Sequence, residues 1–257
     1  MTQVNRTAIV TGGLSGMGFA IACKLARDGI DITIGARRGG DAELVRAKLA
    51  PAGITAHVAA LDVRSSDSVD AFVAEVVSRR GGVDILVNTA GVYDEAPVIG
   101  HSDKVWDDQI DTNLSGTFRM IRAVMPHMTA AGWGRIVNLA SVAAHQGMAN
   151  NAAYCASKAG LLGLGRCVSL EGAAHGVTCV SISPTWVETE MLRQFIDADI
   201  QATGKSLEEV RADYAASNPQ HKLVQPSEIA DLAAFLVSDA ARAITMEDIQ
   251  VNAGSLW

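Results

Sequence analysis

The sequence is poor in the residues on which disulfide-stapled or metal-bound proteins depend. Its 257 residues include four cysteines, six histidines and six prolines. No two cysteines form a CxxC pair and no two histidines lie four residues apart, so we expect no metal site and interpret the cysteines as reduced thiols. Aromatic residues make up only 5%, and the core must therefore rest on Ala, Val, Leu and Ile. A chain of this length can bury a large core without staples.

Excess positive charge and long apolar runs are also missing. The formal net charge is -7, which argues against general attraction to nucleic acid or an anionic membrane. No apolar run approaches the roughly 20 residues that span a bilayer. The first residues lead directly into a strand pattern, without a basic-then-apolar leader. We therefore expect a cytoplasmic protein with neither nucleic acid nor membrane as a partner.

A regular alternation of strand and helix patterns is what the sequence does contain. Short β-branched runs predict strands at residues 7–12, 30–36, 55–63, 83–91, 134–141 and 177–184. Helical periodicity predicts helices at residues 19–29, 42–53, 65–81, 103–130 and 151–174. Such alternation favours an α/β fold in which helices cover both faces of a parallel sheet. No linker divides the chain, so we expect one domain over residues 1–257.

One connection is longer and more polar than the others. Residues 186–222 contain two further helical patterns and follow the last of these predicted strands. In α/β proteins a long insertion after a strand often forms a lid over the substrate. We predict a helical substrate lid here, and a surface subdomain used only for packing is the alternative.

The stretch TGGLSGMG, residues 11–18, follows the first strand and opens the first helix. Its glycines permit a tight turn and close approach of a ligand, and free N–H groups at a helix start can hold a pyrophosphate. The glycine spacing differs from the G-x-G-x-x-G fingerprint. Glycine-rich turns also serve as plain connectors, but the strand–loop–helix context predicts nucleotide binding.

The stretch ITIGARRGG, residues 32–40, bears on which nucleotide is bound. An acidic residue often holds an adenosine ribose at this point, but here Ala36 is followed by Arg37. A guanidinium can bind a 2′-phosphate bidentately, so we expect NADP(H), with NAD(H) as the second choice. Ser15 is a further candidate for contact with the phosphate. A solvated arginine pair is the alternative, which we prefer for Arg38.

Tyr154 and Lys158 lie four residues apart on a predicted helix and thus on one face. A cationic lysine beside the phenol should lower the tyrosine pKa and make Tyr154 a proton donor to a carbonyl oxygen. Ser141 ends the preceding strand, where it could bind the same oxygen, and Asn113 lies in the long helix before it. Taken singly, each residue is more often structural: the pair as a packed ring and a solvated amine, the serine as a helix cap and the asparagine as polar surface.

In combination these residues resemble the short-chain dehydrogenase/reductase family, and the likeness covers essentially the whole chain. The matching motifs, in order, are T-G-x-x-x-G-x-G at 11–18, L-D-V at 61–63, N-T-A-G at 88–91, Asn113, Ser141, Y-x-x-x-K at 154–158 and P-x-W-V-x-T at 184–189. The resemblance implies a Rossmann-type, doubly wound parallel sheet in three layers, a nicotinamide cofactor and a homotetramer built through the two long helices.

The resemblance also implies roles for individual residues. Tyr154 would be the acid/base, and Lys158 would tune it and hold the nicotinamide ribose. Ser141 would position the carbonyl, and Asn113 would support a water that relays protons. The implied cofactor contacts are Gly12, Leu14, Ser15, Gly16, Met17, Gly18, Arg37, Asp62, Val63, Asn88, Ala90, Gly91, Tyr154, Lys158, Pro184, Val187 and Thr189.

Three departures from the family pattern stand out. Thr89 replaces the second Asn of N-N-A-G, Thr185 replaces the Gly of P-G, and VNAGSLW replaces the usual V-D-G-G ending. No catalytic group is lost, but Thr185 places a bulkier residue where the family has glycine beside the nicotinamide.

Within the family, residues 143–165 and 224–239 look most like 3-oxoacyl reductases and the ketoreductases of aromatic polyketide synthesis. We therefore expect NADPH-dependent reduction of a ketone, free or as an acyl thioester, with an apolar body. The alternatives are an NAD-dependent dehydrogenase of a hydroxy acid, polyol or sterol, and a non-catalytic NADPH-binding regulator. The substrate residues that we predict are Tyr93, Val142, Ala143, Met148, Asn151, Trp186 and Met191.

Overall fold

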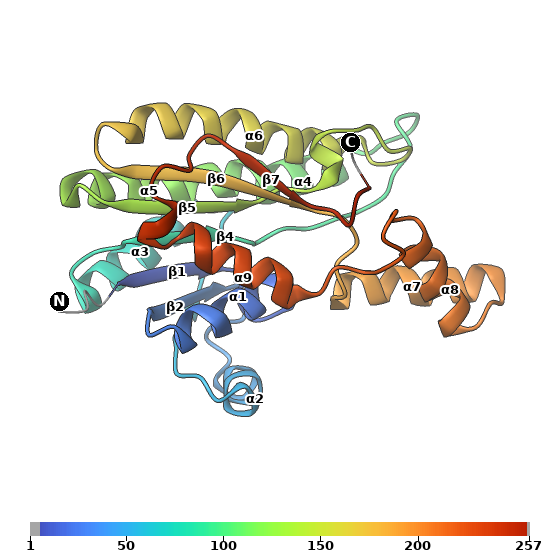
Figure 1. Cartoon of the computed structure of the whole chain (residues 1–257), viewed down its shortest axis with the longest axis horizontal. Helices are drawn as coiled ribbons and strands as arrows, with labels where there is room; N and C mark the ends of the chain where they lie inside the picture. Colours follow the sequence, from blue (N-terminus) through green and yellow to red (C-terminus); the bar gives the residue numbers. More distant parts are fainter. Residues whose placement is uncertain (1–5, 256–257) are drawn as a thin grey trace.

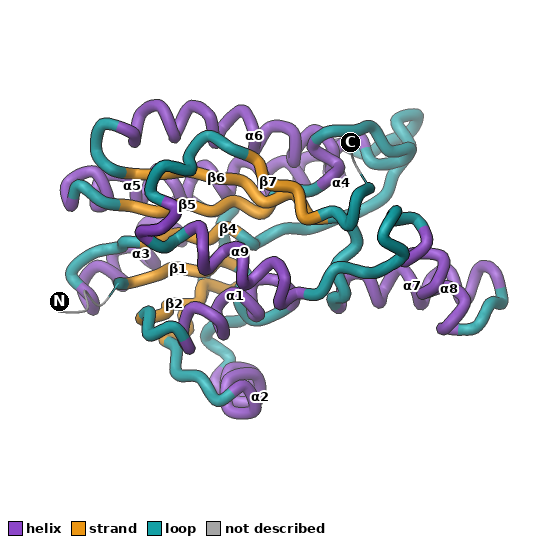
Figure 2. The backbone as a smooth tube through the Cα atoms, viewed as in Figure 1, coloured by secondary structure: helices purple, strands orange, loops and turns teal. Residues whose placement is uncertain are grey.

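A seven-stranded parallel sheet forms the centre of the molecule, a computed structural model that describes residues 6–255 (Figures 1 and 2). The other residues of the predicted domain 1–257, including the last two of VNAGSLW, lie outside this range. The strands are β1 (Thr7–Thr11), β2 (Asp31–Ala36), β3 (His57–Ala60), β4 (Ile85–Asn88), β5 (Gly134–Leu139), β6 (Val177–Pro184) and β7 (Asp248–Val251). Their order is β3-β2-β1-β4-β5-β6-β7, so the winding direction reverses between β1 and β4. Ligands of such sheets bind beyond the carboxyl ends of the strands at this reversal.

Helices cover both faces of the sheet and extend beyond one end of it (Figure 1). They are α1 (Gly16–Arg27), α2 (Ala42–Ala52), α3 (Ser66–Arg80), α4 (Asp103–Gln109), α5 (Gly116–Ala131), α6 (Ala152–Ala173), α7 (Glu190–Thr203), α8 (Leu207–Ala216) and α9 (Pro226–Leu236). Two separate cores result, because each sheet face packs against its own helices. The predicted α/β fold, with three layers and a doubly wound parallel sheet of the Rossmann type, is confirmed.

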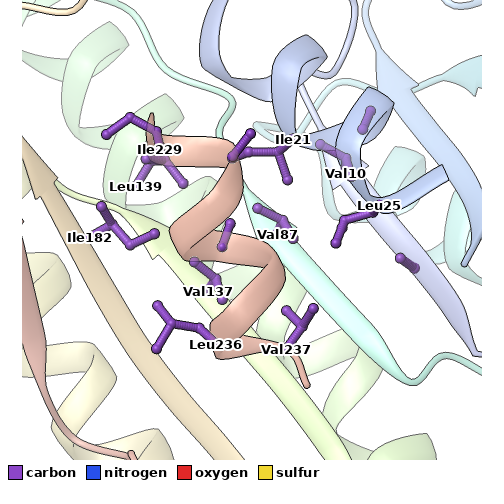
Figure 3. Packing of buried hydrophobic residues seen from close by; sticks show 14 of the residues in the cluster. Val10, Ile21, Leu25, Val87, Val137, Leu139, Ile182, Ile229, Leu236 and Val237 are labelled. Carbon is purple, nitrogen blue, oxygen red and sulfur yellow. The ribbon is translucent and has the colours of Figure 1, made fainter. Parts of the chain in front are cut away.

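Helices α1 and α9 pack side by side over one face. Figure 3 shows Ile229, Leu236 and Val237 of the α9 region in the same cluster as Ile21 and Leu25 of α1 and the side chains of the central strands. The other face is covered by α3, α5 and α6, whose apolar residues form the second core. Burial on both faces explains why the central strands read as continuous apolar runs.

The predicted helix at 103–130 is interrupted, which corrects the sequence prediction. A π-helical turn at Ile110–Ser115 separates α4 from α5. The wider turn inserts an extra residue, a change that helical periodicity does not reveal. It carries Asn113, whose side chain is buried rather than part of a polar surface.

The segment at 186–222 folds into α7 and α8, which lie beyond the carboxyl end of the sheet (Figure 2). These helices enclose a small cluster of their own around Leu192, Ile196 and Val210. A β-bridge between Val187 and Val224 joins the two ends of the segment. Within the described part of the chain, no helix combines the length and apolar character needed to cross a bilayer.

Candidate active site

The glycine loop lies against the chain that follows β4. Gly12 has φ +67°, and a Cβ there would lie 3.0 Å from Ala90 Cα. A Cβ on Gly18 would lie 2.2 Å from Thr89 Oγ1, which donates a hydrogen bond to the Thr11 carbonyl, and 2.9 Å from the backbone oxygen of Gly12. Only glycine fits at Gly12 and Gly18, so sequence and packing agree on the loop.

The start of α1 offers N–H groups to a ligand. Ser15 is the N-cap residue, but its side chain makes no capping hydrogen bond, and the first turn contains no acidic residue. The first N–H groups of a helix have no intrahelical partner and favour an anion. Because Ser15 and Gly16 line a groove of about 510 Å³, these groups fit a phosphate.

The groove holds most of the predicted cofactor contacts. Its lining includes Gly12, Leu14, Ser15, Gly16, Met17, Gly18, Arg37, Asp62, Val63, Ala90, Gly91 and Thr189. Asn88 lies outside it, buried in β4, where its Nδ2 donates to Asn138 Oδ1 at 2.9 Å. Lys48 and Arg64 also line the groove and were not predicted, because neither belongs to a recognised motif.

The two arginines after β2 differ in their partners. Arg38 pairs with Asp41 at 2.6 Å and has a side chain that is 72% exposed, as the surface interpretation predicted. Both arginines line the groove, but among residues 6–255 Arg37 has no carboxylate partner within ion-pair distance. Its positive charge contributes to lowering the pKa of Asp62, after the larger effect of Arg64. Arg37, like Lys48, is therefore a cation of the groove that no carboxylate engages among the described residues.

Ser141, Tyr154 and Lys158 converge beyond the end of β5. Ser141 accepts a hydrogen bond from the Ala143 N–H at 3.1 Å and thereby caps a short 3-10 turn. Tyr154 and Lys158 occupy successive turns of α6, and Lys158 Nζ donates to the Leu139 carbonyl at 2.7 Å. All three residues line one cavity of about 400 Å³.

The pKa shifts of Tyr154 and Lys158 correct the expectation that the lysine lowers the tyrosine pKa. Burial raises the pKa of Tyr154 above its ordinary value, and a hydrogen bond with Ser141 opposes this effect only in part. Burial lowers the pKa of Lys158 to about 8. The predicted lowering of the tyrosine pKa was wrong, because the ammonium lies 5.6 Å from the ring centroid and donates its hydrogen bond to the Leu139 backbone carbonyl. Tyr154 is therefore a protonated phenol at neutral pH.

Asn113 is tied into the loop after β4. Its Oδ1 accepts from the Val92 N–H at 2.8 Å, and its Nδ2 donates to the Val92 carbonyl at 2.9 Å and to Ser157 Oγ at 3.1 Å. A Cβ on Gly91 would lie 3.3 Å from Asn113 Oδ1 and 3.9 Å from Lys158 Nζ. Asn113 thus lies at the same end of the sheet as Lys158, with its amide engaged in shaping the loop.

Most of the predicted substrate residues line the cavity that holds Tyr154. Those that do are Tyr93, Val142, Met148, Trp186 and Met191, together with the cofactor candidates Pro184, Val187 and Thr189. Ala143 and Asn151 do not line it: Ala143 is buried in the 3-10 turn, and Asn151 forms a bridge with Ala96. The lining residues that were not singled out include Gln146, Phe195, Ser217, Asn218 and Ser255.

Aromatic rings form one wall of this cavity. The Tyr93 ring meets the Tyr154 and Phe195 rings edge-on, each with centroids 4.9 Å apart, and Phe195 in turn approaches Trp186 at 6.0 Å. Edge-on contacts of this kind stabilise aromatic clusters. Phe195 lies one helical turn after Leu192, and that spacing in α7 was the available signal for it. The wall makes the cavity suitable for an apolar ligand body.

Comparisons with known proteins agree with this geometry. A family model described as short chain dehydrogenase matches residues 6–199. A putative ketoacyl reductase of Streptomyces coelicolor is 36% identical over 255 residues, 98% of each chain. A 3-oxoacyl-acyl-carrier-protein reductase of Staphylococcus epidermidis is 34% identical over 252 residues, 98% of this chain and 99% of that one. A crystal structure of an actinorhodin polyketide ketoreductase variant with NADPH superposes with a TM-score of 0.92 at 37% identity, covering 99% of this chain and 98% of that one.

Proposed function

Since the chain belongs to the short-chain dehydrogenase family and is related to ketoacyl and polyketide ketoreductases, we propose that it is an NADPH-dependent ketoreductase. The observation that carries the proposal is the convergence of Ser141, Tyr154 and Lys158 on one cavity beside the glycine-loop groove. Met17 and Thr189 line both spaces. A dinucleotide in the groove would therefore end at the catalytic tyrosine.

The groove fits a phosphorylated dinucleotide. The uncapped start of α1 would hold the pyrophosphate, and Arg37 would hold a 2′-phosphate. Lys158 would hold the nicotinamide ribose, and Val187 and Thr189 the carboxamide. Bound NADPH supplies the hydride.

The residues of the chain would orient the substrate carbonyl and donate a proton to it. Ser141 would donate a hydrogen bond to the carbonyl oxygen of the substrate and hold it beside the phenol of Tyr154. Tyr154 is protonated at neutral pH, so it can transfer its proton to that oxygen as negative charge develops there. The raised pKa of Tyr154 favours this direction, because oxidation of an alcohol would need the phenolate.

The proposed substrate is a ketone with an apolar body, such as a 3-oxoacyl or polyketide-like compound, free or as an acyl thioester. The aromatic wall of Tyr93, Phe195 and Trp186 supports this choice. The relatives whose names specify 3-oxoacyl-acyl-carrier-protein or polyketide substrates support it as well. An NAD-dependent alcohol dehydrogenase and a non-catalytic NADPH-binding regulator are the alternatives that the experiments below distinguish.

The first test is NADPH oxidation with a panel of β-keto esters, acyl thioesters, quinones and cyclic ketones. We expect turnover with one of these classes, followed as loss of absorbance of the reduced nicotinamide. NADPH binding without turnover on any member would favour the regulator. Reduction of NAD by secondary alcohols at far higher kcat/KM would favour the dehydrogenase.

Ala36→Asp with Arg37→Ala should move cofactor preference toward NADH. The carboxylate would repel a 2′-phosphate and accept from a ribose hydroxyl, while loss of Arg37 removes the cation. We expect the ratio of Kd for NADPH to Kd for NADH to change by about 10²-fold, or roughly 3 kcal/mol. Arg38→Ala is the matched control, since Arg38 lines the same groove but is paired with Asp41. A larger effect in the control would show that Arg37 is not the phosphate ligand.

A cytoplasmic homotetramer remains our proposal for the working form. The outer faces of α4, α5 and α6 expose Trp106, Phe118 and Leu170, which are 40%, 45% and 69% accessible. Exposed apolar side chains on neighbouring helices favour association. They support the interface predicted at residues 103–130 and 151–174.

A further inference from the structure

Four polar residues that line the substrate cavity take no part in the proposed catalysis. We call Thr185, Ser217, Asn218 and Ser255 the polar corner; all four line the cavity. Thr185 and Ser217–Asn218 come from opposite ends of the 186–222 region, and Ser255 comes from the chain after β7. Asn218 is fully buried, and buried polar groups are expected to have defined hydrogen-bond partners.

The direction of each hydrogen bond in the polar corner is fixed by chemistry. Asn218 Nδ2 donates to the Lys222 carbonyl at 2.8 Å. A carbonyl can only accept, so the amide nitrogen must face Lys222 and Oδ1 must face Thr185. Thr185 Oγ1 lies 3.0 Å from that Oδ1, and its single proton is therefore given to Asn218. Toward any ligand, the Thr185 hydroxyl presents lone pairs alone.

A second polar atom of the same corner lacks a partner. Ser255 Oγ is shielded from solvent and makes no hydrogen bond within residues 6–255. An unpaired buried hydroxyl of this kind costs stability in the free protein. The Thr185 hydroxyl, whose proton is engaged, is thus the group of the polar corner that is left to accept from a ligand.

We propose that Thr185, oriented by Asn218, is a specificity-determining hydrogen-bond acceptor that selects a ligand bearing an N–H or O–H donor beside the nicotinamide end of the cavity. The inference rests on the proposed function. Two donors qualify: the carboxamide N–H of the nicotinamide, and a hydroxyl group on the ketone substrate. Asn218 is a positioning residue in this scheme, because it acts on the ligand only through Thr185.

The test compares matched ligands in one variant, Thr185→Val, which removes the acceptor at nearly constant volume. Kd is measured by calorimetry for NADPH and for its 3-acetylpyridine analogue, which lacks the carboxamide N–H. Kd is also measured, with oxidised cofactor present, for 1-tetralones carrying one hydroxyl group and for their methyl ethers. An unpaired donor typically lowers affinity about tenfold. If the variant loses affinity for NADPH but not for its 3-acetylpyridine analogue, the carboxamide is the donor. If it loses affinity for a hydroxylated tetralone but not for the methyl ether, the substrate hydroxyl is the donor.

Equal changes for both members of each pair, or no change, would overturn the proposal. Thr185→Val also leaves Asn218 Oδ1 unpaired and lowers stability, but this cost is common to both ligands of a pair and cancels. Thr185→Ser keeps the hydroxyl and should restore affinities to within about threefold. Because the readout is binding, it is independent of turnover: wild-type protein that binds NADPH but reduces no ketone would contradict the proposed function and leave the cofactor comparison valid.

Discussion

Tyr154→Phe should reduce kcat/KM for ketone reduction about 10³-fold and leave Kd for NADPH within about twofold. General acid catalysis by a positioned side chain contributes roughly 10²–10⁴ in rate. The phenyl ring retains the edge-on contact with Tyr93, so the wall of the cavity is preserved. Stopped-flow single turnover together with NADPH titration separates chemistry from binding.

Tyr214→Phe is the matched control for that experiment. The Tyr214 hydroxyl donates to Asp199 at 2.8 Å, and its ring packs on Trp186 without lining the cavity. We expect kcat/KM within about threefold of wild type. If Tyr154→Phe kept more than a tenth of wild-type activity, another group would have to supply the proton, and the catalytic assignment would be wrong.

Gly39→Ala should destabilise the fold by about 3 kcal/mol, because the new methyl group would meet a backbone carbonyl of β3, which cannot rotate away as a side chain can. A Cβ at this position would lie 2.0 Å from the Ala59 carbonyl oxygen. Relief requires the turn after β2 to move off β3, and Arg37 lies in that turn. Thermal unfolding should show Tm lower by about 6–12 °C, and Kd for NADPH should rise.

Gly40→Ala provides the neighbouring control. A Cβ there meets no atom within 4 Å, and its backbone is not left-handed. Tm should change by less than about 2 °C, since surface substitutions of this kind alter stability little. If both variants lowered Tm equally, the flexibility of the two glycines, rather than the close contact of Gly39 with β3, would explain why glycine is needed in this turn.

The sequence predicted the central layers well, because both faces of a parallel sheet are buried and its strands are therefore apolar throughout. Six strands were located in this way, whereas β7, with the sequence DIQV, is too short and polar to stand out. The π turn around Asn113 was not predictable, since one extra residue in a turn does not break an apolar pattern.

The candidate catalytic and cofactor residues that line the groove and the cavity were found where they belong to local motifs. The polar corner could not, because Thr185 and Asn218 are far apart in the sequence and meet only through the path of α7 and α8. The direction of the Tyr154 pKa shift could not be predicted from the sequence either. Burial determines that direction, and the spacing of Tyr154 and Lys158 on one helix face does not reveal how deeply the two side chains are buried.

The packing of α1 on α9 has a consequence for protein synthesis. Helix α1 carries the glycine loop at its start, yet its apolar face is covered by a helix translated much later (Figure 3). A ribosome would release nearly the whole chain before Ile21 and Leu25 find their partners in α9. Nascent chains should therefore gain affinity for the proposed dinucleotide only near the end of translation, and the apolar face of α1 stays exposed until then.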